Sequence, residues 1–522
     1  MTRDRVSGVL VHPTSFPGPH GIGDLGPAAF RFIDWLGTAG QRRWQLMPLG
    51  PTGLGDSPYA SPSAFAGNPL LVSLEWLGGE GLLRPEDFGQ IPEFRDWEVD
   101  FGAVYEFKMP LLRRAYERHR GQNDPARNAQ FAAFRDDEAD WLLDFAIFQA
   151  AKSATGGTAW WTWEEPLRRH EPAALDRARS EWADEIAFQQ FIQFQFRRQW
   201  TTLKRYANER NIQIIGDIPI FVALDSSDVW ANQAVFRLDA GGQPEVIAGV
   251  PPDYFSPTGQ LWGNPHYDWH ELSRTGFALW IDRVRAILAR VDIIRVDHFR
   301  GFAAAWAIPY GSEDATPGEW QKAPGAELFA AIRARLGDVP FIAEDLGIIT
   351  EDVVALRQEL EIPGMKVLQF AFGDGPDNVY LPHNYDEVDT VVYSATHDNE
   401  TTVGWFHHLS DEQRHEVQRY LGRDGSDIAW DLIRTALSSV ADTAIFPLQD
   451  VMRLGDEGRM NTPGRLGGNW GWRYHEHQLH TGLAADLDEI TSIYGRQLPT
   501  SKERGYDPYD YTAPDTAHPL RS

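Results

Sequence analysis

The chain lacks cysteine throughout its 522 residues. It therefore forms no disulfide bond and has no thiolate for catalysis or metal binding. Residues 1–8 also lack the apolar run of a secretory signal peptide. No run of about 18 apolar residues is present, so the sequence predicts no transmembrane helix. Together these absences favour a cytoplasmic protein.

Basic residues are scarce compared with acidic ones. The chain has 48 Lys and Arg against 75 Asp and Glu, which gives a formal net charge of −27 at pH 7. This charge repels nucleic acid and anionic membranes, so we expect neither as a partner. A neutral substrate fits better than a polyanionic one. The sequence does not specify the oligomeric state, and a monomer is compatible with it.

Short apolar runs of the kind that form buried parallel strands recur along the chain, mostly with helical patterns between them. Eight such runs separated in this way predict one closed (β/α)8 barrel, a TIM barrel of the α/β class. The predicted strands are residues 8–13, 42–48, 214–219, 293–299, 341–346, 367–370, 391–398 and 443–450.

The chain is longer than a plain barrel, which typically has about 250 residues. Large insertions on the catalytic face account for the excess. The first, at about 50–210, carries helical patterns and should be mainly α-helical. The second, at about 221–275, is rich in loops and is a candidate lid over the active site. We expect residues 1–500 to form a single catalytic domain and residues 501–522 to form a loosely held tail.

Three carboxylates each come just past a short apolar run, at or near the end of one of the predicted strands: Asp297, Glu344 and Asp398. The carboxyl ends of barrel strands meet at the catalytic face, so these three side chains should gather there. Pairs of carboxylates at one face are what the cleavage of glycosidic bonds requires.

Asp297 stands two residues after Arg295, so both side chains should face the inside of the barrel. An adjacent guanidinium favours the ionised carboxylate, which suits a nucleophile. A purely structural ion pair inside the barrel would leave the same pattern.

Glu344 is surrounded by apolar residues at the end of its predicted strand. Burial raises the pKa of a carboxyl group, which suits a general acid near neutral pH. A cap on the following helix is the alternative, but Thr350 already fits that place. His397 and Asp398 stand at the end of the predicted strand 391–398 and offer polar groups to sugar hydroxyls. Such a pair is also common by chance.

Interpretations that involve a cofactor are weaker. His475, His477 and His480 are the only cluster of histidines with ligand-like spacing, and they fit a solvated helix face better. Residues 21–26 match G-x-G-x-x-G formally, but their context favours a turn. We therefore predict no metal ion and no other cofactor.

The ordered motifs of this chain resemble those of the 4-alpha-glucanotransferases of the amylomaltase, or disproportionating enzyme, family, which is glycoside hydrolase family 77 of the α-amylase clan. The resemblance extends over about residues 7 to 500. It rests on residues 50–59 (GPTGLGDSPY), 63–68 (SAFAGN), 216–219 (GDIP), 249–253 (GVPPD), 261–265 (LWGNP), 295–301 (RVDHFRG), 343–347 (AEDLG) and 396–401 (THDNET).

This resemblance implies a retaining enzyme that transfers segments of α-1,4-glucans, such as maltooligosaccharides and amylose, through a covalent glucosyl-enzyme. It implies Asp297 as nucleophile, Glu344 as general acid and base, and Asp398 as transition-state stabiliser. It further implies substrate-binding roles for Tyr59, Asp217, Asp253, Tyr254, Phe255, Trp262, Arg295, His298, Asp374, His397 and Asn469.

Two other functions stay open at this point. A hydrolytic enzyme of the α-amylase type would use the same three acids. A catalytically inactive glucan-binding scaffold would need neither a buried glutamate nor an aspartate paired with arginine, so the acids argue against it.

Overall fold

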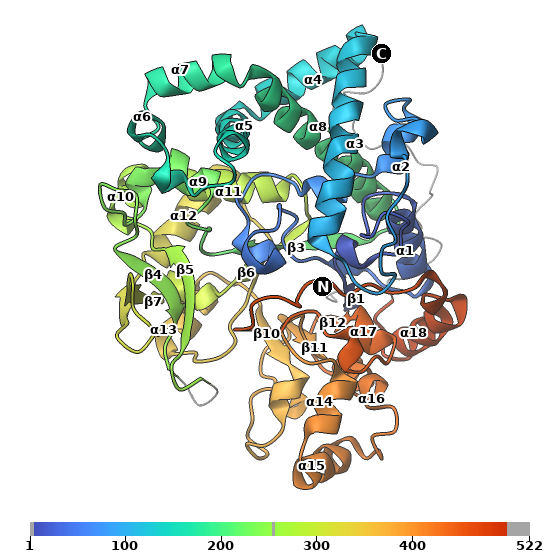
Figure 1. Ribbon diagram of the computed structural model, residues 1–522. Coiled ribbons are helices and arrows are strands. Elements are labelled where there is room, and N and C mark those ends of the chain that lie inside the picture. Colours follow the sequence, from blue (N-terminus) through green and yellow to red (C-terminus); the bar gives the residue numbers. More distant parts are fainter. Residues whose placement is uncertain (1–4, 253–255, 498–522) are drawn as a thin grey trace.

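The computed structural model describes residues 5–252 and 256–497, and a parallel β-barrel lies at its centre (Figure 1). The strands follow the order β10-β11-β12-β1-β2-β3-β6-β9. The ring closes between β9 and β10, where the Ala343 N–H donates to the Pro363 carbonyl at 2.8 Å. The predicted TIM barrel is thus confirmed. Its strands are β1 (Val6–Leu10), β2 (Arg43–Gln45), β3 (Gln213–Pro219), β6 (Ile293–Asp297), β9 (Phe341–Ala343), β10 (Gly364–Val367), β11 (Thr390–Tyr393) and β12 (Thr443–Pro447).

Side chains of the strands alternate between the inside of the barrel and the surrounding helices, as the strand period of two requires. Leu10 packs inside, whereas its neighbour Val9 belongs to the larger outer core. On β6 the inner positions are Ile293, then Arg295 and Asp297 toward the carboxyl end. The inner cluster consists of Leu10, Ile215, Ile342, Met365, Val367, Val391, Tyr393 and Ile445.

Several strands end earlier than the sequence predicts. The predicted strand 391–398 ends at Tyr393, and the predicted strand 443–450 gives way to a short helix, α17 (Leu448–Val451). Most of the predicted strand 367–370 is a helical turn, because β10 pairs with β11 from Gly364 onward. A Cβ at Gly364 would lie 2.4 Å from the Asp345 carboxylate, so glycine is needed at the start of this strand.

Helices of the first insertion stand together above the barrel in Figure 1. The long α8 packs against α5 and α3, and its Trp200 lies 6.2 Å from Trp44 of the barrel strand β2. This aromatic contact joins the helices to the barrel. The insertion contains α2 (Leu74–Gly79), α3 (Phe101–Gln122), α4 (Pro125–Asp137), α5 (Ala139–Ala154), α6 (Glu165–Arg168), α7 (Pro172–Glu181) and α8 (Ala183–Asn208).

A second sheet, antiparallel and in the order β5-β4-β7-β8, lies beside the barrel. Its strands are β4 (Val246–Val250), β5 (Gln260–Pro265), β7 (Ala304–Pro309) and β8 (Glu319–Lys322). The sequence suggests only loops at 249–265, because glycine and proline interrupt any strand pattern. Gly249 is nevertheless required within β4, since an added Cβ would lie 2.1 Å from the Gln260 carbonyl oxygen.

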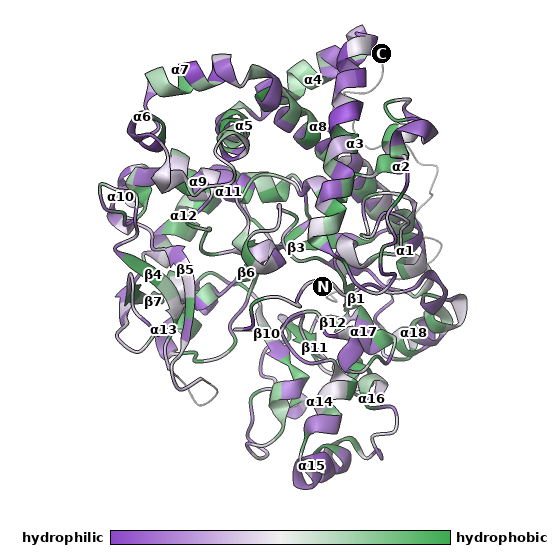
Figure 2. Ribbon diagram, in the orientation of Figure 1, coloured by the Kyte–Doolittle hydropathy of each residue, from purple (hydrophilic) through white to green (hydrophobic). Residues whose placement is uncertain are grey.

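The remaining helices surround the barrel. Figure 2 shows α15 mainly in the hydrophilic colour, in keeping with a surface helix whose Val417 is buried. These helices are α1 (Pro27–Thr38), α9 (Ser227–Ala231), α10 (Trp269–Arg274), α11 (Ala278–Leu288), α12 (Gly325–Leu336), α13 (Glu351–Glu359), α14 (Thr402–His408), α15 (Asp411–Leu421), α16 (Ile428–Ser438), α17 and α18 (Thr481–Ile493).

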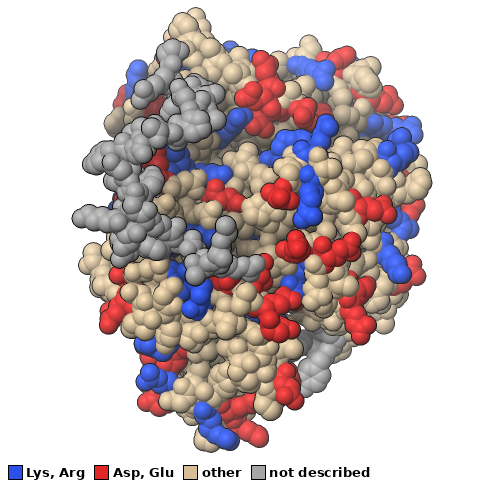
Figure 3. Space-filling model, turned by 180° about the vertical axis from the view of Figure 1, so that it is seen from behind, with Lys and Arg blue, Asp and Glu red and all other residues tan. Residues whose placement is uncertain are grey.

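Charge is distributed over the surface. On the face turned away from the viewer in Figure 1, acidic side chains lie interspersed with basic ones (Figure 3). None of the helices in the described part of the chain is long and apolar enough to cross a membrane. The predicted tail, residues 501–522, lies outside the described residues.

Candidate active site

Asp297 and Glu344 leave neighbouring strands at the same end of the barrel. Strands β6 and β9 pair in register up to the residues that immediately precede them. The backbone N–H of His298 donates to Glu344 Oε2 at 2.8 Å, and the N–H of Leu346 donates to Oε1 at 3.0 Å. The Glu344 carboxylate is therefore held by main-chain groups next to Asp297.

Arg295 joins two carboxylates on the inner face of the barrel. Its Nη1 donates to Asp297 Oδ1 at 3.0 Å and to Asp217 Oδ2 at 2.6 Å. The side chains of Arg295 and Asp217 are 4% and 1% exposed, whereas that of Asp297 is 29% exposed. Asp297 alone of the three is thus open to a substrate while its inner oxygen is held.

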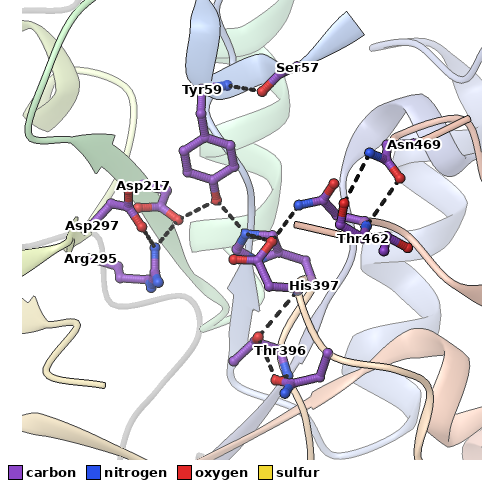
Figure 4. Close-up of polar contacts among 12 residues, drawn as sticks. Ser57, Tyr59, Asp217, Arg295, Asp297, Thr396, His397, Thr462 and Asn469 are labelled. Atoms are coloured by element: carbon purple, nitrogen blue, oxygen red, sulfur yellow. Dashed lines mark hydrogen bonds and ion pairs between the residues drawn. The ribbon is translucent and has the colours of Figure 1, made fainter. Parts of the chain in front are cut away.

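Tyr59 connects this group with the opposite side of the barrel (Figure 4). Its hydroxyl donates to Asp217 Oδ2 at 2.9 Å and accepts from the Nε2–H of His397 at 2.9 Å. The rings of Tyr59 and His397 also stack, with centroids 5.3 Å apart. A side chain from the first insertion therefore connects a residue within β3 to one that follows the distant strand β11.

Asp398 lies on a loop that follows β11. Its Oδ1 accepts from Asn461 Nδ2 at 2.7 Å and lies 3.5 Å from His397 Nε2. Its side chain is 47% exposed and thus more open than that of Asp297. Together with the contacts above, this forms one polar network that runs from Asp297 to Asp398.

The electrostatics separate the roles of the acids. Burial raises the pKa of Glu344 to about 7, with Asp297 adding to the rise and Arg295 opposing it. Burial likewise raises the pKa of Asp217. Burial lowers the pKa of His397, and it lowers that of His298 to about 3. Both imidazoles are therefore neutral near pH 7, and Glu344 holds its proton there far more than an ordinary glutamate.

The other predicted substrate-binding residues differ in how close they lie to the three acids. Trp262 on β5 packs edge-to-face on His298, with centroids 4.8 Å apart, beside Asp297. Asn469 binds backbone groups of its own loop, at Thr462 and Arg465. Asp374 is exposed.

Within residues 5–252 and 256–497, no polar contact joins Asp374 or Asn469 to the three acids. Asp253, Tyr254 and Phe255 lie outside the described residues.

Two residues of the site are not among the site residues predicted from the sequence. Asn461 donates to Asp398, and Trp470 packs at 5.7 Å from Tyr59 and 6.0 Å from His397. Both belong to a polar, glycine-rich segment without periodicity. The aromatic residues of that segment are the only signal that could have pointed to it.

One group of possible metal ligands occurs among the described residues: Glu400, His408 and Asp456. The ring nitrogens of His408 are already engaged, at 2.8 Å from Glu400 and 3.3 Å from Asp456. Arg459 also lies 3.3 Å from Glu400. The two carboxylates of this group are thus already paired with His408 and Arg459.

Comparisons with known proteins give the family. The family model described as 4-alpha-glucanotransferase matches residues 11–480. The chain is 50% identical to the 4-alpha-glucanotransferase of Synechocystis sp. over 501 residues, which cover 95% of this chain and 99% of that protein. It is 50% identical to the enzyme of Thermus thermophilus over 494 residues, covering 93% and 98%. The chain belongs to the 4-alpha-glucanotransferase family.

The fold of this glucanotransferase agrees with that assignment. The structure of amylomaltase from Streptococcus agalactiae in complex with acarbose matches it with a TM-score of 0.92 and 40% identity, covering 95% of this chain and all of that one. Amylomaltase from Corynebacterium glutamicum, at 19% identity and a TM-score of 0.74, shares the fold. The family and the enzyme class predicted from the sequence motifs are confirmed.

Proposed function

We propose that this glucanotransferase moves segments of α-1,4-glucans to the 4-hydroxyl of glucose or of another glucan, by double displacement with retention. One observation carries the proposal: a carboxyl group with a raised pKa, Glu344, lies at the end of the strand next to Asp297, which Arg295 binds. A protonated and an ionised carboxyl group side by side are what a retaining mechanism requires.

In the first step, an oxygen of Asp297 attacks the anomeric carbon of the donor. Glu344 gives its proton to the glycosidic oxygen, so the reducing-end segment leaves with a free 4-hydroxyl. A glucosyl ester with Asp297 remains, with its configuration inverted. Asp398, open to the cleft, stabilises the positive charge that develops on the sugar ring.

In the second step, Glu344 is ionised and accepts the proton of an acceptor hydroxyl. The acceptor oxygen attacks the anomeric carbon, and the Asp297 carboxylate leaves, which restores the original configuration. When the acceptor is the other end of the same long glucan, the product is cyclic. Water competes for the same ester, so transfer depends on acceptor binding and on the exclusion of water.

We assign the substrate contacts to three groups. Tyr59, Asp217, Arg295 and His397 form the network that orients the acids, and Trp262 with His298 forms an aromatic wall beside Asp297. Asp253, Tyr254, Phe255, Asp374 and Asn469 are proposed as further glucan contacts on the strength of the sequence motifs. Maltooligosaccharides and amylose are the proposed substrates, and the acarbose complex of the Streptococcus agalactiae amylomaltase supports a glucan-shaped cleft.

The product pattern from maltotriose tests the proposal. Transfer yields a ladder of longer and shorter maltooligosaccharides together with glucose, whereas hydrolysis yields only shorter sugars. Chromatography of a time course resolves the two. If no product longer than maltotriose forms, the alternative of a hydrolytic enzyme of the α-amylase type replaces the transferase.

A further inference from the structure

A further carboxylate, Asp450, lies near the carboxyl end of the barrel and has no role in the mechanism above. It follows β12 within the short helix α17, and it is fully buried. Its oxygens accept three hydrogen bonds: from Ser394 Oγ at 2.7 Å, from Thr402 N–H at 2.8 Å and from Thr402 Oγ1 at 2.7 Å. All three donors come from one neighbouring segment.

That segment, residues 394–402, carries His397 and Asp398. Ser394 is its first residue after β11, and Thr402 is its last residue before the rest of α14. Asp450 therefore binds both ends of the segment at once. The interior of the segment is braced separately, since Asn399 Oδ1 accepts from the Thr396 N–H at 2.9 Å and from its Oγ1 at 2.7 Å.

A second buried side chain holds the same segment from the other side. Gln369, which follows β10, donates through Nε2 to the Glu400 carbonyl at 2.9 Å and lies 3.4 Å from Thr402 Oγ1. The segment is thus clamped between residues that follow β10 and β12, the two strands that flank its own. Asp450 supplies the larger share of these bonds.

A buried carboxylate costs stability unless hydrogen bonds compensate for its lost hydration. An apolar side chain at position 450 would fill the space without that cost, but it would leave three buried donors of the segment unsatisfied. The carboxylate is therefore matched to these donors, and its effect falls on the segment that carries Asp398.

We propose that Asp450 is a positioning residue of the glucanotransferase reaction, which acts by fixing residues 394–402 so that His397 and Asp398 face the sugar at the acid pair. The proposal rests on the role proposed above for Asp398. Displacement of a catalytic group by about 1 Å can lower the rate by about 100-fold, so a loss of this clamp should reach catalysis.

Two substitutions at this position separate geometry from charge. Asp450→Ala removes all three hydrogen bonds. Asp450→Asn keeps a carbonyl oxygen for the Thr402 N–H, and its amide can donate to the hydroxyls of Ser394 and Thr402, which also accept. A role in positioning therefore predicts that the asparagine variant retains the function that the alanine variant loses.

Asp292 provides a matched control at the opposite end of the barrel. It precedes β6, and its Oδ2 accepts from the Ile214 N–H and from Asn208 Nδ2, both at 2.8 Å. Asp292→Ala removes a similar clamp far from the acids. It should lower the melting temperature without changing the turnover of the folded enzyme.

The measurement is kcat and KM for maltotriose, together with the melting temperature, for each full-length variant. We expect Asp450→Ala to lower kcat by about 30-fold or more with KM changed less than about threefold, since the loss falls on the transition state. Asp450→Asn should stay within about fivefold of the wild type, and Asp292→Ala within about twofold. Should the alanine variant not fold, the double variant Ser394→Ala, Thr402→Val replaces it, with about a 10-fold loss expected.

Three results would overturn the proposal. They are a folded Asp450→Ala enzyme with kcat within about threefold of the wild type, an equal loss in Asp292→Ala, or an equal loss in Asp450→Asn, which would assign the effect to charge.

Asp398→Asn is measured alongside. If Asp398→Asn keeps full turnover, the proposed role of Asp398 fails; if it is inactive while Asp450→Ala is active, only the role of Asp450 fails.

Discussion

The acid cluster has two halves that are built differently. Asp297 and Glu344 stand at the ends of paired strands, and backbone N–H groups or a side chain of the same strand hold them. Asp398 stands on a loop, and an amide from a distant segment, Asn461, holds it. The first half is fixed by the barrel itself, whereas the second depends on side chains that reach it from elsewhere.

The two halves also differ in the roles that we propose for them. The strand half contains the groups that form and break covalent bonds in the proposed mechanism. In the same proposal, Asp398 of the loop half stabilises the charge that develops on the sugar ring, and Tyr59 links it through His397 to the strand half. Substitutions in the strand half should therefore abolish individual chemical steps, and substitutions in the link should reduce the rate while leaving the steps intact.

Removal of the proposed nucleophile should cause the largest loss of activity among these substitutions. Asp297→Asn keeps the size of the side chain but cannot form the ester, so kcat should fall by about 10⁴-fold or more. Glucan binding should persist, which calorimetry with a long maltooligosaccharide checks. Activity within a few-fold of the wild type would refute the assignment of Asp297.

Removal of the general acid, Glu344, should give the next largest effect, and the size of this effect should depend on the donor. Glu344→Gln should lower turnover of maltotriose by about 10²- to 10⁴-fold, because the leaving group is no longer protonated. A maltosyl fluoride donor needs no acid, so formation of the ester from it should be far less impaired. An equal loss with both donors would contradict the role of Glu344 as general acid.

The pH dependence of the reaction tests the role of Glu344 as well. Glu344 is the general acid in its protonated form, and burial raises its pKa to about 7. The value of kcat/KM for maltotriose should therefore fall by about tenfold for each pH unit above that value. With maltosyl fluoride this decline should be absent. A decline that is the same for both donors would assign it to another group.

The link between the halves should give a smaller effect. Tyr59→Phe removes the hydroxyl that joins Asp217 to His397, so the buried Asp217 carboxylate and His397 Nε2 each lose a hydrogen-bond partner. That loss is worth about 1–3 kcal/mol, so kcat should fall by about 10-fold or somewhat more. Tyr206→Phe, which removes a hydroxyl bound to Asp34 on the surface, is the matched control. Equal kinetics in the two variants would exclude an aligning role for Tyr59.

The same division explains what the sequence could predict. Asp297 and Glu344 are recognisable because each follows a buried parallel strand, and strand neighbours in a barrel bring such residues together. The side chain that donates a hydrogen bond to Asp398, Asn461, lies 63 residues further along the chain. Its position depends on the tertiary packing of a polar loop, which carries no periodic pattern.

The second sheet escapes prediction from the sequence for a related reason. Strand β4 contains glycine and is followed by two prolines, which ordinarily mark a loop. It pairs because β7, which follows the acid strand β6, supplies a partner. Similarly, Trp470 could not be assigned, since its contact with Tyr59 joins residues from opposite ends of the chain.

The covalent ester is the central claim, and it can be trapped. Glu344→Gln treated with maltosyl fluoride should form the ester and then hold it, because the base for the second step is missing. Mass spectrometry of the intact protein and of its peptides should find one maltosyl group, attached to Asp297. Two results would contradict the proposed double displacement. One is a label on Asp398 or on residues next to position 344, and the other is the release of fluoride without any label on the protein.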